Sequence, residues 1–378
     1  MTQPKLLFLA TEDWFVGSHF RPLLRRAAAD GFEVVVAARD TGALAADEGV
    51  RVIAMPFARA SLAPAALWAE VRAFNALLQA ERPQIVHAIA LKPIGLAVLA
   101  DAARERAVVF ALTGRGYLGA RGGLRGFALE ALAGGVRAAL RRKNGFLLTE
   151  NEADRAWVLD GADVSAERAL IMPGAGVDPD AFQPAPEPAS PPVIVGVAAR
   201  LVRSKGVDLA VAAVRRLRQQ GVQIELRVAG AVDEDNPEHV TDDVLTGWRA
   251  EPGVTLLGRV SDINVFWAGA HIACLPSRGG EGLPRSLLEA AACGRPMVTT
   301  QTPGCADFVV NNETGLVVPR DDVDALADAL AVLAKDPELR TRMGLSARTR
   351  VLAGYTEAHA AAVASAAWRR SLTLATNT

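Results

Sequence analysis

The stretch Pro276-Ser-Arg-Gly-Gly-Glu-Gly-Leu-Pro-Arg-Ser-Leu-Leu-Glu-Ala-Ala-Ala-Cys-Gly-Arg-Pro296 contains two acids, Glu281 and Glu289, around the junction of a glycine-rich loop and an apolar segment. The segment predicts a helix over residues 283–292, because proline is tolerated in a first helical turn and Gly294 follows the last apolar residues. Glycines before a helix leave its free N–H groups accessible, and such groups bind phosphate. We therefore expect this stretch to bind a phosphorylated ligand.

Each of the two acids has a predicted role and an ordinary alternative. Glu281 precedes the helix and is expected to accept hydrogen bonds from sugar hydroxyls, whereas Glu289 is expected to bind a ribose diol. Alternatively, Glu281 only complements the helix dipole and Glu289 lies on a solvated helix face.

The spacing of the two acids resembles the E-x7-E signature of retaining glycosyltransferases of family four. Other segments that are similar to this family follow the same order along the chain: residues 171–178, 195–208, 226–230, 254–260 and 315–319. The resemblance implies an α/β GT-B fold, with two facing Rossmann-like domains, parallel sheets and a C-terminal helix that crosses back to the first domain. It also implies that the donor is bound by Glu289, Gly280, Gly282, Leu283, Pro284, Arg285 and Val260.

Short apolar runs alternate with helical patterns in both halves of the chain, which indicates parallel sheets covered by helices. The proline-dense segment 183–192 predicts an extended, semi-rigid connector. We therefore expect an acceptor-binding Rossmann-like domain at residues 1–182, a Pro-rich linker at 183–192, a nucleotide-sugar-binding domain at 193–355, and a C-terminal crossover helix and tail at 356–378.

The composition excludes several classes of protein. The chain has 378 residues, 51% of them hydrophobic, and a formal net charge of -1, which suits a two-domain enzyme rather than a basic nucleic-acid binder. Its three cysteines include no C-x-x-C pair, which argues against a disulfide framework and a thiolate metal site. No apolar run is long enough to span a bilayer. A cytoplasmic protein without a nucleic-acid partner is expected.

Two basic residues are candidates for binding a diphosphate. Arg200 and Lys205 lie in a predicted loop between an apolar strand and the helix that begins near residue 207. Basic loop residues are commonly just solvated, but these two match the Arg and Lys positions of the family that the chain resembles. The expected catalytic residues are therefore Glu281, Arg200 and Lys205, whereas Arg203 matches neither position and is expected at the surface.

The acceptor side is predicted less closely by the sequence. Gly17 and Ser18 are expected in a loop that a substrate can approach, beside His19. Many members of the family carry a histidine two positions beyond the residue that matches His87, and this chain has Ile89 there. His19, His87 and Lys92 are thus alternative contacts to the acceptor. A loop of Thr113, Gly114, Arg115 and Gly116 is also expected on the acceptor side.

Two further patterns suggest other ligands. Residues 114–119 match the G-x-G-x-x-G pattern of dinucleotide-binding proteins, but no acid ends a following strand at the expected distance. Asp233 and Asp235, like Asp178 and Asp180, have the spacing of carboxylates that hold a divalent cation, yet the surrounding residues suggest surface turns. We expect no metal and no cofactor, with a nucleotide sugar as co-substrate and a UDP-sugar favoured over a GDP-sugar.

A basic and apolar segment predicts either a membrane-surface helix or a helix packed on its own sheet. Its cations are Arg121, Arg125, Arg137, Arg141, Arg142 and Lys143, and its apolar residues are Leu124, Phe127, Leu129, Leu132, Val136 and Leu140. In the first case the protein would lie peripherally on anionic lipid at the inner face of the cytoplasmic membrane.

The combined expectation is a retaining hexosyltransferase that moves a sugar from a nucleotide sugar to a glycan or a polyprenyl-diphosphate-linked acceptor. The resemblance extends to transferases of capsule, O-antigen and other lipid-linked glycan assembly. Two alternatives remain: a nucleotide-sugar epimerase of GT-B architecture and a non-catalytic protein that binds sugar nucleotides.

Overall fold

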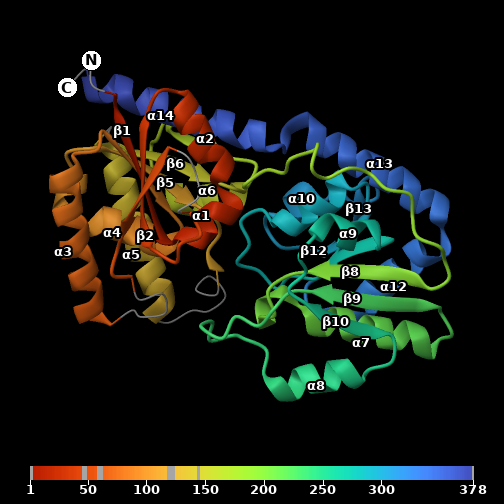
Figure 1. Cartoon of the computed structure of the whole chain (residues 1–378). Helices are drawn as coiled ribbons and strands as arrows, with labels where there is room; N and C mark the ends of the chain where they lie inside the picture. Colours follow the sequence, from red (N-terminus) through yellow and green to blue (C-terminus); the bar gives the residue numbers. More distant parts are fainter. Residues whose placement is uncertain (1–2, 45–48, 58–62, 117–123, 143–144, 377–378) are drawn as a thin grey trace. The chain divides into compact units, whose positions relative to one another are not determined.

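The computed structural model describes residues 3–44, 49–57, 63–116, 124–142 and 145–376 of the chain (Figure 1). The chain divides into two compact units, one comprising Met1–Ala175 with Glu357–Thr378 and the other Gly176–Thr356. Each unit is built on a parallel sheet against which helices pack. The predicted α/β class with two Rossmann-like domains is confirmed.

The described part of the first unit contains a seven-stranded sheet in the order β3-β2-β1-β4-β5-β6-β7. Its strands are β1 (Lys5–Glu12), β2 (Glu33–Arg39), β3 (Val50–Ala54), β4 (Ile85–Ile89), β5 (Ala107–Leu112), β6 (Gly145–Thr149) and β7 (Ala169–Ile171). Its α-helices are α1 (Asp13–His19), α2 (Arg21–Ala29), α3 (Pro64–Glu81), α4 (Leu91–Leu99), α5 (Leu124–Arg141), α6 (Glu152–Leu159) and α14 (Glu357–Thr376). Every residue of β4 and β5 is buried, as expected for parallel strands covered on both faces.

The second unit has a six-stranded sheet among its described residues, in the order β10-β9-β8-β11-β12-β13. Its strands are β8 (Val193–Ala198), β9 (Ile224–Ala229), β10 (Val254–Gly258), β11 (Ile272–Leu275), β12 (Met297–Thr300) and β13 (Gly315–Val318). Its α-helices are α7 (Val207–Gln219), α8 (Asp242–Ala250), α9 (Ile263–Ala268), α10 (Arg285–Ala292), α11 (Cys305–Phe308), α12 (Val323–Lys335) and α13 (Pro337–Gly354).

Strand order locates the place in each sheet where a ligand is expected. The order reverses between β1 and β4 in the first sheet and between β8 and β11 in the second. Loops that leave neighbouring strands in opposite directions at such a point open a crevice outside the carboxyl ends of the strands. The loops after β8 and β11, and those after β1 and β4, are therefore the segments to inspect.

His87 is a core residue, and its predicted contact with an acceptor is wrong. It lies in the middle of β4 with none of its surface exposed, and its Nδ1 accepts a hydrogen bond of 3.0 Å from Nε1 of Trp368. Trp368 belongs to α14, which lies beside α2 in the first unit (Figure 1). His87 thus fixes the C-terminal helix to the first sheet.

The Pro-rich segment 183–192 belongs to the second unit, so the predicted boundary differs from the observed one. Arg295 donates hydrogen bonds to the carbonyls of Ala185 (2.8 Å) and Pro186 (3.4 Å), and Arg340 forms an ion pair with Glu187 (2.7 Å). Both arginines are almost fully buried. These contacts explain why a segment with the composition of a linker is held in place, while the units divide between residues 175 and 176 and again between 356 and 357.

Gly17 and Ser18 lie in helix α1, and the predicted small-residue loop is wrong. The helix begins at Asp13, directly after β1, and the buried Asp13 carboxylate accepts hydrogen bonds from Thr41 N (2.9 Å), Thr41 Oγ1 (2.5 Å) and Ala43 N (3.0 Å). Burial raises the pKa of Asp13, but these hydrogen bonds outweigh it and lower the pKa overall. A charged Asp13 therefore anchors α1 to the segment after β2.

The basic segment forms α5, whose apolar face packs against the first unit. Leu129, Val136 and Leu140 are buried, whereas Phe127 is 75% exposed. Three of the apolar residues that could have met lipid, Leu129, Val136 and Leu140, are thus packed in the core, and membrane contact stays a prediction. Arg121, Lys143 and residues 117–119 of the glycine pattern lie outside the described residues. Among the residues that the structure describes, no helix has both the length and the apolar character needed to cross a bilayer.

The buried imidazole predicts a pH-dependent stability of the fold. Burial lowers the pKa of His87 from 6.5 to about 3, so the unfolded chain binds a proton between these pH values and the folded chain does not. The free energy of unfolding should therefore fall by up to about 1.4 kcal/mol for each pH unit below 6.5 because of this residue. Urea unfolding of wild type and His87→Asn, which keeps an acceptor near Trp368, measures the difference. Equal pH dependence of the two proteins between pH 4 and 8 would contradict the assignment.

Candidate functional site

An ion pair between Lys205 and Glu281 joins the two loops at the switch point of the second sheet. Lys205 lies in a turn between β8 and α7, and Glu281 lies in the loop between β11 and α10. The Lys205 Nζ is 2.7 Å from both carboxylate oxygens of Glu281, and both side chains are mostly shielded from solvent. Ser277 Oγ lies 3.0 Å from Glu281 Oε1. The structure thus brings together two of the three predicted catalytic residues.

Two glycines, one after β8 and one after β12, allow neighbouring segments to pack closely against the loop that carries Glu281. Gly206 has a φ of +69°, and a Cβ there would overlap the carbonyl oxygen of Pro276. Gly304, with a φ of +78°, is similarly in contact with the carbonyl oxygen of Gly282. Only glycine combines this backbone conformation with such an approach, so both glycines hold neighbouring segments against the Glu281 loop.

Arg200 lies at the same edge of the sheet but is paired with an acid. Its Nη1 is 2.5 Å from Oδ2 of Asp233, and about half of the Arg200 side chain is exposed. Asp233 is one of the residues that suggested a cation site, and here it binds a guanidinium. Among the described residues, no group of three or more histidine, cysteine or acidic side chains is placed to hold a metal ion.

The predicted helix begins two residues later than expected, at Arg285. Pro284 is its N-cap residue, with an extended ψ of 119°, and a residue before proline is disfavoured in the helical conformation, which excludes Leu283. Arg285 Nε donates a hydrogen bond of 2.9 Å to Glu289 Oε1. Burial raises the pKa of Glu289, an effect that Arg285 only partly offsets.

The other predicted donor contacts surround this helix start. Gly280 and Gly282 flank Glu281, and Leu283 and Pro284 are buried directly before α10. Val260 follows β10 at the carboxyl edge of the sheet and packs against the apolar cluster that contains Leu283 and Leu287. The predicted donor residues therefore lie on the carboxyl side of one sheet.

The predicted acceptor residues lie along the carboxyl edge of the first sheet, except for His87, and several are engaged with neighbouring side chains. Lys92, at the start of α4, forms an ion pair of 2.7 Å with the buried Glu70. Arg115, in the segment of Thr113, Gly114 and Gly116 after β5, forms an ion pair of 2.8 Å with Asp154. His19 Nδ1 lies 2.7 Å from Ser18 Oγ. The geometry therefore does not single out one acceptor contact.

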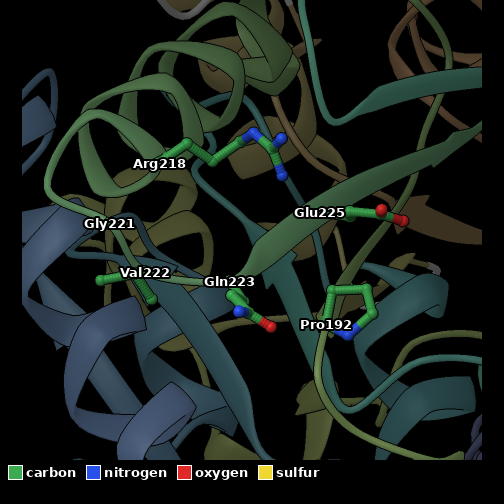
Figure 2. Close-up of a pocket in the computed structure, with 6 residues that line it drawn as sticks. All are labelled: Pro192, Arg218, Gly221, Val222, Gln223 and Glu225. Carbon is green, nitrogen blue, oxygen red and sulfur yellow. The ribbon is translucent and has the colours of Figure 1, made fainter.

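A hollow at the opposite edge of the second sheet is distinct from this site. Figure 2 shows its lining, which includes Pro192, Gln223 and Arg218, and the Arg218 Nη1 donates a hydrogen bond of 2.9 Å to the carbonyl of Ile224. Residues 192 and 223 directly precede β8 and β9, so the hollow lies at the amino ends of the strands. Arg218 thus already binds a backbone carbonyl, and the hollow lies at the opposite end of the strands from Glu281.

Two residues of the carboxyl edges were missed by sequence analysis. Asp13 was not identified, although an acid directly after a buried strand was a usable signal. Arg278 was not identified, because its role depends on acids at positions 208 and 321, which no local pattern connects to it.

Comparison with known proteins assigns the chain to a family. The model "Glycosyltransferase Family 4" matches residues 16–146 and the model "Glycosyl transferases group 1" matches residues 192–336, which together cover more than half of the chain. The chain belongs to glycosyltransferase family 4. The predicted membership of this family and the predicted GT-B architecture are thereby confirmed.

Among curated relatives, this family 4 chain is similar to the capsular polysaccharide biosynthesis glycosyltransferase CapM of Staphylococcus aureus. The two are 30% identical over 158 residues, which are 42% of this chain and 41% of CapM, so the chain spans less than half of that relative. Its fold is similar to sucrose-phosphate synthase from Thermosynechococcus elongatus, with a TM-score of 0.80 and 19% identity over 98% of this chain and 100% of the other. It is also similar to Anabaena HepE solved with UDP-glucose, with a TM-score of 0.70 and 16% identity over 98% and 99% of the two chains.

The glycine contact at the site predicts a stability difference between two matched variants. Gly206→Ala adds a Cβ that overlaps Pro276 O, whereas at Gly221, which has a φ of +83°, nothing lies within 4 Å of an added Cβ. Both variants pay for the left-handed backbone, so the clash should cost Gly206→Ala a further 1–3 kcal/mol, roughly the cost of overpacking. Urea unfolding measures this difference, and equal destabilisation of the two variants would contradict the packing described for the loop.

Proposed function

We propose that the chain is a retaining glycosyltransferase that transfers a sugar from a nucleotide sugar, with a UDP-sugar favoured, to a glycan or a polyprenyl-diphosphate-linked acceptor. The observation that carries the proposal is the Lys205–Glu281 ion pair at the switch point of the second sheet. A cation and an acid placed there side by side suit the diphosphate and the sugar hydroxyls of one donor molecule.

Lys205 has the hydrogen-bonding capacity for both tasks. An ammonium group has three N–H donors, and two of them are accounted for by the two oxygens of Glu281 at 2.7 Å. The third N–H can therefore donate a hydrogen bond to a phosphate oxygen of the donor. Glu281 carries further lone pairs that accept hydrogen bonds from sugar hydroxyls, so that the ion pair orients the diphosphate and the sugar together.

The reaction breaks the bond between the anomeric carbon and the diphosphate and forms a bond from the same carbon to an acceptor oxygen on the same face. Negative charge develops on the diphosphate as it leaves, and Lys205 and Arg200 stabilise that charge. The proton of the acceptor hydroxyl passes to the leaving phosphate, so no strong protein base is needed. Arg200 must exchange Asp233 for the phosphate in this mechanism.

The related proteins support this reading. CapM is named for capsular polysaccharide biosynthesis, which supports surface polysaccharide synthesis, and HepE, which has a similar fold, was solved with UDP-glucose, which supports a nucleotide sugar as the donor. These names describe those proteins, and for this chain the donor base, the sugar and the acceptor are part of the proposal.

Removal of the Lys205 ammonium should weaken the binding of a nucleoside diphosphate. A charge-assisted hydrogen bond contributes about 1.5–3 kcal/mol, so we expect Lys205→Ala to weaken UDP binding about 10- to 100-fold in isothermal titration calorimetry. Arg203→Ala is the matched control, since Arg203 is exposed in the same turn and should change the affinity less than about twofold. EDTA should have no effect on binding. Equal affinities of wild type and Lys205→Ala would remove Lys205 from the donor site.

Turnover with retention of configuration is the second expectation. The chain should release UDP from a UDP-α-sugar only when an acceptor is present, and proton NMR of the product should show an α-linkage. A suitable acceptor source is a cell-derived pool of lipid-linked glycans. A β-linked product would contradict retention, conversion of the UDP-sugar without acceptor would indicate an epimerase, and binding without turnover would indicate a non-catalytic protein.

A further inference from the structure

Arg278 connects three loops at the carboxyl edge of the second sheet. Its Nη1 and Nη2 each lie 2.7 Å from one carboxylate oxygen of Asp208, in the first turn of α7, and its Nε lies 2.5 Å from Oδ1 of Asp321, which follows β13. The same side chain donates to the carbonyl of Arg203 (2.8 Å), and the backbone N–H of Arg278 donates to the carbonyl of Ser204 (2.8 Å). A single residue in the loop after β11 thus binds the segments that follow β8 and β13.

These contacts enclose Lys205 on both sides. The two carbonyls directly before Lys205 are held by residue 278, and Gly206, directly after it, packs against the carbonyl of Pro276. The backbone of Lys205 is therefore fixed against the loop after β11, the same loop that carries Glu281 three residues beyond Arg278. In this arrangement the Lys205 Nζ lies 2.7 Å from the Glu281 carboxylate.

Loss of the Arg278 contacts should loosen the 203–206 turn more than it destabilises the fold. The side chains of Asp208 and Asp321 are 47% and 62% exposed, so water can solvate both carboxylates when the guanidinium is absent. The carbonyl of Arg203 would lose a charged donor, whereas the backbone N–H of residue 278 would still donate to Ser204, and no buried charge would be left unpaired. A variant at position 278 should therefore fold and still have a looser 203–206 turn.

We propose that Arg278 is a positioning residue of the donor site, which aligns Lys205 with Glu281 so that the ammonium meets the donor diphosphate. The role rests on the proposed function, because it supposes that a nucleoside diphosphate binds at this edge. Arg278 acts through Lys205 and has no contact with the reacting atoms.

Hydrogen exchange of the ligand-free chain tests the positioning role. The amides of Lys205 and Gly206 donate to the carbonyls of Val202 (3.0 Å) and Arg203 (3.1 Å) and should exchange at least about tenfold faster in Arg278→Gln. Arg215→Gln is the control, since Arg215 lies on α7, the helix that follows the turn, and makes two comparable bonds to Glu251, at 2.7 and 2.6 Å. Exchange in the 202–207 peptides should be unchanged in this control. Equal exchange in Arg278→Gln and wild type overturns the proposal.

A double-mutant cycle tests whether the effect passes through Lys205. Arg278→Gln should weaken UDP binding about tenfold in the wild-type background and less than about twofold in the Lys205→Ala background. Arg278→Lys, which keeps the charge without the planar fork, should restore only part of the affinity. Losses that simply multiply in the double variant would show that Arg278 acts independently of Lys205 and would overturn the role.

The two proposals fail in different ways. A wild-type chain that binds no nucleoside diphosphate overturns the proposed function, and with it the donor role of Arg278. A wild-type chain that binds UDP, together with an Arg278→Gln variant of equal affinity or equal exchange, overturns only the positioning role.

Discussion

The second unit depends on one close contact between opposite charges, the Lys205 ammonium and the Glu281 carboxylate. The two residues are 76 positions apart in the chain and come within 2.7 Å of each other. Two largely buried charges are tolerated only when each is paired and hydrogen-bonded. The sheet order satisfies this requirement, because β8 and β11 are neighbours and the loops after them leave from the same edge. The contact of Gly206 with Pro276 then removes the space that would separate these two loops.

The parts of the fold that were predicted well are those with strong local patterns. Helix α7 begins at Val207, as expected from sequence, because it has an amphipathic period and a clear beginning at Gly206. The loop of Glu281 and the turn of Lys205 were also identified, since motif spacing along the chain places them. Their mutual contact was not predicted, because it depends on β8 and β11 being neighbours in the sheet, which no local pattern shows.

The errors concern residues whose environment is made by distant parts of the chain. His87 has the sequence position of a residue at a strand end, and its burial arises from Trp368, 281 positions later. The Pro-rich segment has the composition of a free linker, and it is fixed by Arg295 and Arg340, which lie more than 100 positions away. Arg278 was missed for the same reason. On the first sheet, where Lys92 and Arg115 are each paired with a buried acid, the same limitation leaves the acceptor contacts open.

We propose that a nucleoside diphosphate binds at the carboxyl edge of the second sheet, with its phosphates at Lys205. A crystal structure of the chain grown with UDP is the decisive test, because electron density locates the phosphates without assumptions about turnover. We expect a β-phosphate within hydrogen-bonding distance of Lys205 Nζ, and Arg200 turned from Asp233 toward the phosphates. Density for UDP at the amino-edge hollow beside Arg218, with the Lys205 turn unoccupied, would contradict the proposal.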